Sequence, residues 1–300
     1  MGGLASEAPA RIESRPLHPL FGRELIGCDL AAVDDGLARA IEVEIGVAGM
    51  LLFRDVALDD AGLVRLAAAF GPLQDLSGRQ GRPSHVARIS NLDEKGEMLP
   101  VASDTRSQLD ANLLWHVDST YFDPGATFSF LHARIVPEGG ADTEYADLRV
   151  AWEALPADRR AELAPLTADH SIFHSRALIG FDMAGYDRSK LPPVTRHLVR
   201  RHAPSGRDAL LVASHVERVG GLDYAAGRVL IDELTAIATA PDRIYRHQWR
   251  VGDLLMWDNR CMIHRGTPYA QFDEPRDMRS SRVVDAADDG VVRENERTTA

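Results

Sequence analysis

Hydrophobic residues recur every three to four positions in five stretches of the chain, which predicts amphipathic helices there. These stretches are residues 34–49, 59–71, 147–155, 157–166 and 223–239. The first two begin with aspartate pairs that can cap a helix N-terminus, and they end at Gly49 and Gly71. Pro156 separates the third helix from the fourth.

Short apolar runs between turn residues predict strands elsewhere. They lie at residues 12–29 around a turn at Gly22, and at 50–53, 86–89, 114–120, 128–135, 142–145, 209–213, 245–251, 254–258 and 276–285. Many short strands with few helices predict a mainly β protein with flanking helices. We expect a double-stranded β-helix, the jelly roll of cupin-like proteins. No glycine-rich phosphate loop follows a predicted strand, so nucleotide folds have no support.

Three polar stretches without clear periodicity predict loops, at residues 78–83, 94–113 and 172–193. The second and third are long enough to act as lids or binding loops over a site. The pattern predicts a single domain over residues 12–287, with flexible tails at 1–11 and 288–300.

Composition narrows the classes of function. The chain has 300 residues, is 45% hydrophobic and carries a formal net charge of -11, so we expect no nucleic-acid or membrane partner. Its two cysteines, Cys28 and Cys261, form no CxxC pair and indicate a reducing compartment. The N-terminal residues lack the features of a signal peptide. These observations predict a soluble cytoplasmic protein.

Candidate chemistry is concentrated in the stretch Leu114–Thr120. His116 and Asp118 are two residues apart, and on a strand both side chains would leave the same face. An imidazole and a carboxylate are two of the three ligands in the 2-His-1-carboxylate triad that holds non-haem Fe(II). His264, after the stretch Gly252–Arg260, is the candidate for the third ligand.

The motifs together resemble the TauD/TfdA family of Fe(II)/2-oxoglutarate-dependent dioxygenases, with most similarity to the dichlorprop or aryloxyalkanoate dioxygenase-like branch. The resemblance extends from about Ile26 to Asp285. It depends on four motifs, at residues 115–120, 139–143, 204–207 and 252–265.

The resemblance implies that His116, Asp118 and His264 are the metal ligands. It also implies that Thr143 and Arg276 bind the distal carboxylate of 2-oxoglutarate, for which a guanidinium is suited. The expected reaction uses Fe(II), 2-oxoglutarate and O2 to oxidise an unactivated C–H bond of a small organic substrate, and 2-oxoglutarate becomes succinate. Hydroxylation, with ether cleavage at a carbon bearing an ether oxygen, and desaturation are all compatible with this chemistry.

One position departs from the family. A second arginine that often follows the first by four residues, and commonly binds the substrate's acid group, is Ser280 here. On a strand, Arg282 would point to the same side as Ser280 and Arg279 to the other. We therefore take Arg282 and Arg279 as candidate replacements that bind an organic acid. Two alternatives stay open: the substrate has no acid group there, or Arg282 lies on the surface.

Further substrate-binding candidates flank the motif in sequence: Asn91, Trp115 and Tyr121. Four other histidines are expected to be structural or surface residues: His85, His170, His174 and His215. We also expect a homo-oligomer.

Two alternatives remain at this point. A Zn(II) hydrolase could use the same three ligands, since zinc accepts two histidines and a carboxylate. A cupin-like binding protein would have no turnover. Thr143 and Arg276 argue against the hydrolase, because they have no evident part in hydrolysis.

Overall fold

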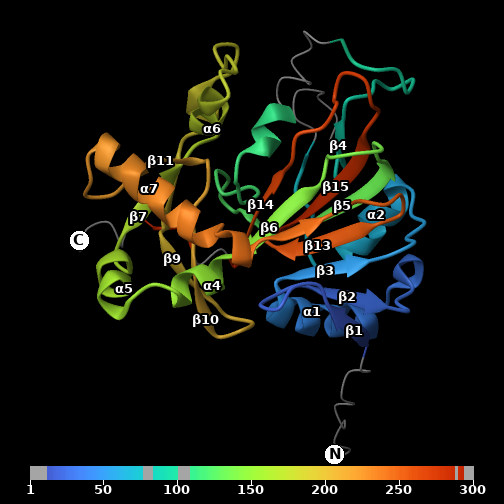
Figure 1. The fold of residues 1–300 in the computed structure, drawn as a ribbon, viewed down its shortest axis with the longest axis horizontal. Helices are drawn as coiled ribbons and strands as arrows, with labels where there is room; N and C mark the ends of the chain where they lie inside the picture. The colour runs from blue at the N-terminus through green and yellow to red at the C-terminus, as the bar shows by residue number, and fades with distance from the viewer. Residues whose placement is uncertain (1–11, 77–83, 101–108, 288–289, 294–300) are drawn as a thin grey trace, which may run out of the picture.

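The fold was taken from a computed structural model, which describes residues 12–76, 84–100, 109–287 and 290–293. Two sheets face each other as in a jelly roll (Figure 1). The major sheet has the order β1 (Glu13–Pro16), β2 (Arg23–Ile26), β3 (Met50–Phe53), β13 (Leu254–Asp258), β5 (Ala126–Ile135), β15 (Asp277–Val284), β4 (Ala87–Ser90). The minor sheet has the order β12 (Tyr245–His247), β6 (Thr143–Asp147), β14 (Met262–Gly266).

Alternation along the strands gives the major sheet two apolar faces. On one face, side chains such as Leu51, Phe130 and Met256 pack against α1 (Asp35–Ala48) and α2 (Asp60–Ala68). On the other face, Leu131 and Leu255 pack toward the minor sheet. The predicted caps are present, because Asp34 and Asp59 accept helix amides and Gly49 ends α1 with φ 74°.

A second lobe is built from the middle of the chain (Figure 1). It holds the sheet β11 (Val216–Val219), β7 (Thr167–His170), β8 (Val194–His197) and the pair β10 (Arg207–Leu210), β9 (Val199–His202). Its helices are α4 (Leu148–Glu153), α5 (Ala157–Leu163), α6 (Ile172–Leu178) and α7 (Tyr224–Ala238). The remaining elements are the 3-10 helices η1 (Leu30–Ala32), η3 (Asp110–Leu113), η4 (Arg188–Lys190) and η5 (Pro241–Arg243).

Three local predictions are wrong. Residues 114–120 are not a strand: His116 makes one isolated bridge and a turn follows, with Ser119 at φ 59°. Residues 172–193 are not all loop, since they contain α6 and η4. The predicted flexible tail is packed at residues 290–293, where Val291 bridges β8 and is buried.

Other predictions fall partly outside the structure. The loop at 78–83 lies outside the described residues, as do residues 101–108 of the predicted lid and the tail at 1–11. In the described part of the chain, no helix is long and apolar enough to cross a membrane.

Candidate active site

His116 and His264 are held side by side by their own backbones. Each amide donates to the other's carbonyl across 2.9 Å, so a loop residue pairs with strand β14 at one point. The ring centroids are 4.2 Å apart. The carbonyl of Leu114 lies 2.7 Å from Nδ1 of His116, which orients that ring. This pairing brings together two histidines that are remote in sequence.

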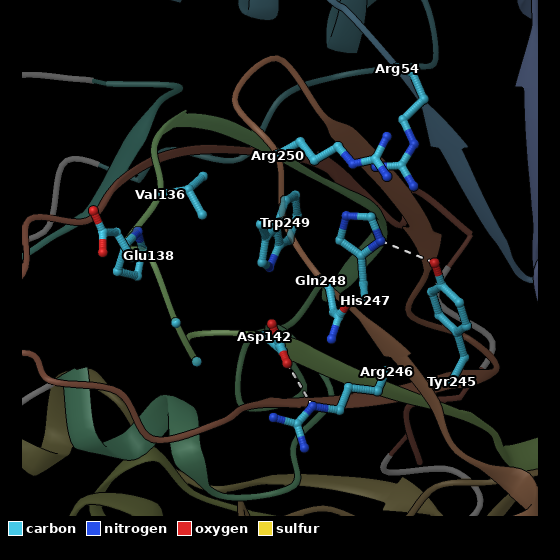
Figure 2. Close-up of a pocket in the computed structure, with 13 residues that line it drawn as sticks. Arg54, Val136, Glu138, Asp142, Tyr245, Arg246, His247, Gln248, Trp249 and Arg250 are labelled. Atoms are coloured by element: carbon cyan, nitrogen blue, oxygen red, sulfur yellow. Dashed lines mark hydrogen bonds and ion pairs between the residues drawn. The ribbon is translucent and has the colours of Figure 1, made fainter.

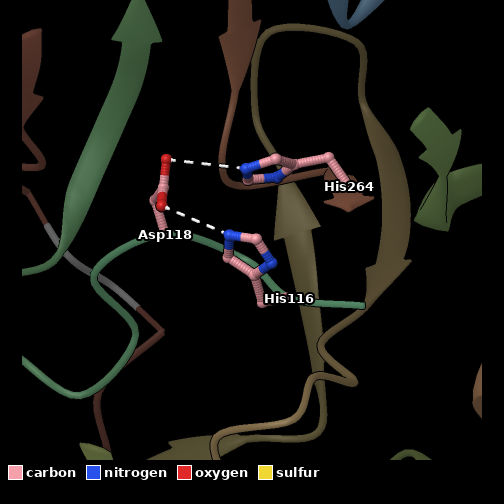
Figure 3. Close-up of side chains that lie close together, drawn as sticks. All are labelled: His116, Asp118 and His264. Atoms are coloured by element: carbon pink, nitrogen blue, oxygen red, sulfur yellow. Dashed lines mark ion pairs between the residues drawn. The ribbon is translucent and has the colours of Figure 1, made fainter. Parts of the chain in front are cut away.

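Asp118 completes the cluster from the turn that follows His116 (Figure 3). Its Oδ1 lies 3.9 Å from Nε2 of His116, and its Oδ2 lies 3.9 Å from Nε2 of His264. One candidate ligand atom from each of the three residues lies within 4.8 Å of the other two. One metal ion could therefore contact both imidazoles and the carboxylate.

The protonation states suit metal binding. Burial lowers the pKa of His116, and it lowers the pKa of His264 to about 3 with help from the neighbouring imidazole. Burial alone would raise the pKa of Asp118, but Arg282, the two histidines and Ser129 hold it below its usual range. At neutral pH the site thus offers two neutral imidazoles and an ionised carboxylate, the forms that bind a metal.

A hydrogen-bonded chain behind the site fixes Asp118. The hydroxyl of Ser129 on β5 donates to Oδ2 of Asp118 across 2.8 Å. Asn259 donates to that hydroxyl across 2.9 Å, and Trp257 donates to Asn259 across 3.1 Å. Sequence reasoning missed Ser129 and Asn259. The available signal was a lone serine inside the apolar run Phe128–Leu131.

A cavity of about 120 Å³ adjoins the cluster, and His116, Asp118 and His264 form part of its wall. Thr143, at the start of β6, also lines it. The hydroxyl of Thr143 accepts a hydrogen bond from the indole of Trp249 across 2.9 Å. Its proton is thereby left to donate toward the cavity. Trp249 was also missed from the sequence.

Arg276 lines the same cavity just before β15. Among the described residues, its guanidinium has no hydrogen-bonded or ion-paired partner, and burial lowers its pKa. Asn91 positions the segment that carries it, because its Oδ1 accepts from the Arg276 amide across 2.8 Å and its Nδ2 donates to Glu274 across 2.8 Å. A charged donor is thus left facing the cavity, as a carboxylate site requires.

The predicted substrate-binding residues are only partly brought together. Asn91 and Arg282 line the cavity, as does Ser280. Arg279 is directed away, because alternation along β15 turns it outward to Asp60 and Asp277. Trp115 lies under the guanidinium of Arg265, and Tyr121 packs against Phe122 and His215, so neither lines the cavity.

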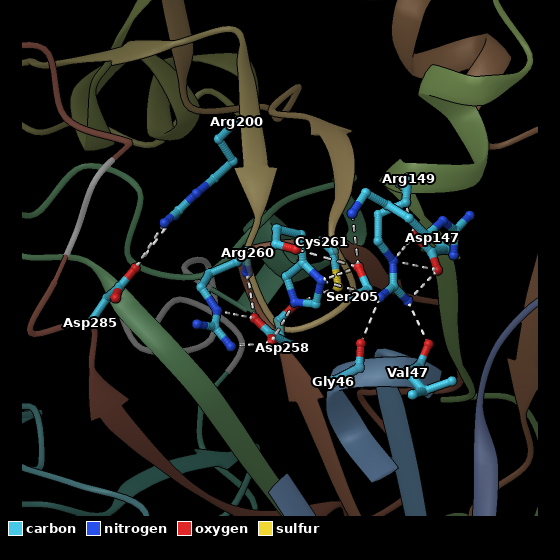
Figure 4. Close-up of polar contacts among 12 residues, drawn as sticks. Gly46, Val47, Asp147, Arg149, Arg200, Ser205, Asp258, Arg260, Cys261 and Asp285 are labelled. Atoms are coloured by element: carbon cyan, nitrogen blue, oxygen red, sulfur yellow. Dashed lines mark hydrogen bonds and ion pairs between the residues drawn. The ribbon is translucent and has the colours of Figure 1, made fainter. Parts of the chain in front are cut away.

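A second group of metal-binding residue types, His202, Asp258 and Cys261, is fully buried (Figure 4). Asp258 already accepts from Arg260 across 2.6 Å and lies 3.0 Å from Nε2 of His202. Arg149 lies 3.3 Å from the other ring nitrogen of His202. Two guanidinium groups here supply the positive charge that a cation would bring, so this cluster is a structural network.

A larger cavity of about 590 Å³ lies behind Trp249 (Figure 2). Charged groups around it are paired with one another: His247 and Arg54 both bond Asp253, at 3.0 and 2.6 Å. Arg246 bonds Asp142 across 2.6 Å. None of His116, Asp118 and His264 lines this cavity. Trp249, which does line it, connects it to the active site through the hydrogen bond to Thr143.

The chain belongs to a dioxygenase family. It matches the family model described as taurine catabolism dioxygenase TauD, TfdA family, over residues 13–282. A relative is the alpha-ketoglutarate-dependent 2,4-dichlorophenoxyacetate dioxygenase of Cupriavidus pinatubonensis, 39% identical over 92% of this chain and 99% of that protein. Another is the (S)-phenoxypropionate/alpha-ketoglutarate-dioxygenase of Sphingobium herbicidovorans, 34% identical over 90% of this chain and 93% of that protein.

Among solved structures, AAD-2 in complex with Mn(II) and N-oxalylglycine is similar, with a TM-score of 0.87 and 33% identity over 95% of this chain and 100% of that one. The predicted family, jelly-roll fold and enzyme class are confirmed. The protein is a non-haem iron dioxygenase that depends on Fe(II), 2-oxoglutarate and O2. The zinc hydrolase and the binding protein have no support among these relatives.

Proposed function

We propose that His116, Asp118 and His264 bind the catalytic Fe(II), and that Thr143 and Arg276 bind the distal carboxylate of 2-oxoglutarate. The observation that carries this proposal is the convergence of two neutral imidazoles and one carboxylate on the wall of a cavity that also contains the Arg276 guanidinium, which has no partner among the described residues. The bound iron and 2-oxoglutarate supply the oxidising chemistry, in which 2-oxoglutarate becomes succinate and a substrate C–H bond is oxidised.

The protein's own contribution is positioning. Arg276 and the Thr143 hydroxyl would each donate to one carboxylate, and a carboxylate held by two donors has a defined orientation. Ser129 and Arg282 would keep Asp118 ionised and fixed, as outer-shell partners of ligands commonly do. Burial of the three ligands limits the access of water to the site.

We propose that the substrate is a small organic acid of the aryloxyalkanoate class. Two of the relatives, a 2,4-dichlorophenoxyacetate dioxygenase and a phenoxypropionate dioxygenase, support this class. Hydroxylation of the carbon that bears the ether oxygen would give an unstable product that breaks down to a phenol and a carbonyl acid.

The test is anaerobic addition of Fe(II) and 2-oxoglutarate to the metal-free protein, followed by O2 and a panel of aryloxyalkanoates. We expect a metal-to-ligand charge-transfer absorption, then succinate and phenol in equal amounts. Succinate without phenol would overturn the substrate class alone. Absence of the absorption would overturn the ligand assignment. A zinc-loaded sample serves as the control and should release neither product.

We also propose a cytoplasmic homo-oligomer. Both cysteines are free, which suits a reducing compartment. Val43 and Val47, one turn apart on α1, are 58% and 56% exposed and would suit a contact between copies. A monomeric mass in light scattering would contradict the oligomer.

A further inference from the structure

Arg282 is only partly neutralised in its position on β15. Its Nη2 donates to Oδ1 of Asp118 across 2.9 Å, and its Nε is buried without a hydrogen-bonding partner in the part of the chain that the structure describes. It also lines the cavity beside Ser280. A buried guanidinium nitrogen with no acceptor is costly, so an additional acceptor at this point would be favourable.

A second arginine approaches from α6, in the segment that sequence reasoning took for a loop. The helix packs directly behind the metal-binding loop: the Ser171 amide donates to the His215 carbonyl across 2.8 Å, and the Ser214 amide donates to the Trp115 carbonyl across 2.9 Å. Ser175 contacts Ser214 hydroxyl to hydroxyl at 3.3 Å. Arg176, the next residue, therefore lies on a helix that is fixed against the neighbours of His116.

Arg176 has no counter-charge in the described part of the chain. Its half-buried guanidinium makes no ion pair or hydrogen bond there, whereas Arg188 on the same lobe binds Glu217 across 2.8 Å. Burial lowers the pKa of Arg176, and the charge of Arg282 lowers it further. The ring of His215, whose carbonyl holds the start of α6, lies 6.2 Å from the ring of His116, centroid to centroid. The two guanidinium groups therefore lie in one region beside the metal ligands.

The charge balance identifies what this region lacks. In the proposed loaded site, the charges of Fe(II) and Arg276 are offset by those of Asp118 and dianionic 2-oxoglutarate. Arg282 then shares the one charge of Asp118 with the metal, and Arg176 has no counter-ion among the described residues. Guanidinium groups bind carboxylates through parallel hydrogen bonds, so a carboxylate is the ligand that this pair would select.

We infer that Arg176 and Arg282 together bind the acid group of the substrate, so that Arg282 contacts both this group and the iron ligand Asp118. This inference rests on the proposed function and specifies how its substrate is held. A carboxylate bound by Arg282 would lie near Asp118, so the adjacent carbon, which carries the ether oxygen in an aryloxyacetate, would be held near the metal ligands. Specificity for acids then comes from α6 as well as from β15.

The test measures binding without turnover. Phenoxyacetate and its neutral analogue phenoxyacetamide are titrated by calorimetry into protein loaded with Mn(II) and N-oxalylglycine. We expect Arg176→Gln to weaken phenoxyacetate binding roughly 10- to 100-fold, the effect of losing a hydrogen bond between charged groups. In the same variant, the dissociation constants of phenoxyacetamide and of N-oxalylglycine should change by less than about 2-fold.

The controls separate this role from others. Arg279→Gln, which removes a guanidinium directed away from the cavity, should leave the phenoxyacetate Kd unchanged. Arg282→Gln touches a metal ligand, so its Mn(II) content is measured first, and Arg282→Lys should restore part of the acid preference. If Arg282→Gln loses Mn(II), the inference is judged from the phenoxyacetate affinity of Arg176→Gln compared with that of wild type.

Unchanged phenoxyacetate binding in Arg176→Gln would overturn the inference. So would an equal loss for the acid and the amide, or wild-type protein that binds neither. The proposed function fails separately, if wild-type protein forms no charge-transfer complex or no succinate.

Discussion

Ser129 and Arg282 face each other across β5 and β15, and both donate to the carboxylate of Asp118. One oxygen of Asp118 accepts from the hydroxyl and the other from the guanidinium. Two neighbouring strands of the major sheet thus fix a carboxylate that comes from a loop. The position of the Asp118 carboxylate therefore depends on the major sheet. Of the three candidate metal ligands, only His264 itself lies on a strand, β14 of the minor sheet.

Removing one of these donors should weaken metal binding. We expect Ser129→Ala to lower the affinity for Fe(II) or Mn(II) about 10- to 100-fold, the usual cost of losing an outer-shell partner. Metal titration monitored by calorimetry measures this. Ser281→Ala is the matched control, because Ser281 is equally buried but its hydroxyl has no partner among the described residues. Equal effects of the two substitutions would contradict the prediction.

The indole of Trp249 should matter for 2-oxoglutarate. Trp249→Phe keeps most of the packing but removes the donor that holds the Thr143 hydroxyl at 2.9 Å. We expect the 2-oxoglutarate Kd to rise roughly 2- to 10-fold, as for the loss of about 0.5–1.5 kcal/mol. Titration of the charge-transfer absorption measures it. Trp152→Phe, at another buried tryptophan, should leave this Kd unaltered.

Asp147 and Arg149 should be a major determinant of stability. Both side chains are fully buried, 2.7 Å apart, and Arg149 also donates to the carbonyls of Gly46 and Val47. Asp147→Asn leaves a buried guanidinium without its counter-ion, so we expect a loss of about 3–5 kcal/mol in the free energy of unfolding. Denaturant titration measures it. Asp208→Asn, in the exposed Arg201–Asp208 pair, should cost less than about 1 kcal/mol.

His170 should make the protein acid-sensitive. Burial lowers its pKa to about 3, and neither ring nitrogen has a partner within the described chain. The unfolded chain binds this proton below about pH 6.5. Between pH 6.5 and pH 3 the unfolded state therefore binds more protons than the folded state. The free energy of unfolding then falls by about 1.4 kcal/mol for each pH unit that the pH is lowered.

We expect His170→Leu to remove this contribution. The unfolding free energy of the variant should therefore rise relative to wild type as the pH falls from 6.5. Denaturant titrations of the metal-free proteins at several pH values measure the difference. A difference that is constant with pH would show that His170 does not titrate in this range.

The sequence by itself determined the local features and the chemical inventory. The aspartate caps of α1 and α2 and the stop at Gly49 act within one or two turns, so their patterns predict them directly. The motif around His116 and Asp118, together with His264, indicated the family, and the resemblance to that family implied a 2-oxoglutarate-binding role for Arg276. These predictions depend on residue types at fixed separations along the chain, and both can be read from the sequence without a structure.

Only the tertiary structure decided which groups meet. Residues 114–120 were predicted as a strand, yet a single bridge to His264 replaces a ladder. Ser129 and Trp249 act through partners remote in sequence, so no local pattern could reveal them. The outward turn of Arg279 was fixed by the register of β15 against β5 and by Asp60 on α2. Pairing between distant segments set each of these outcomes, and local propensity does not encode such pairing.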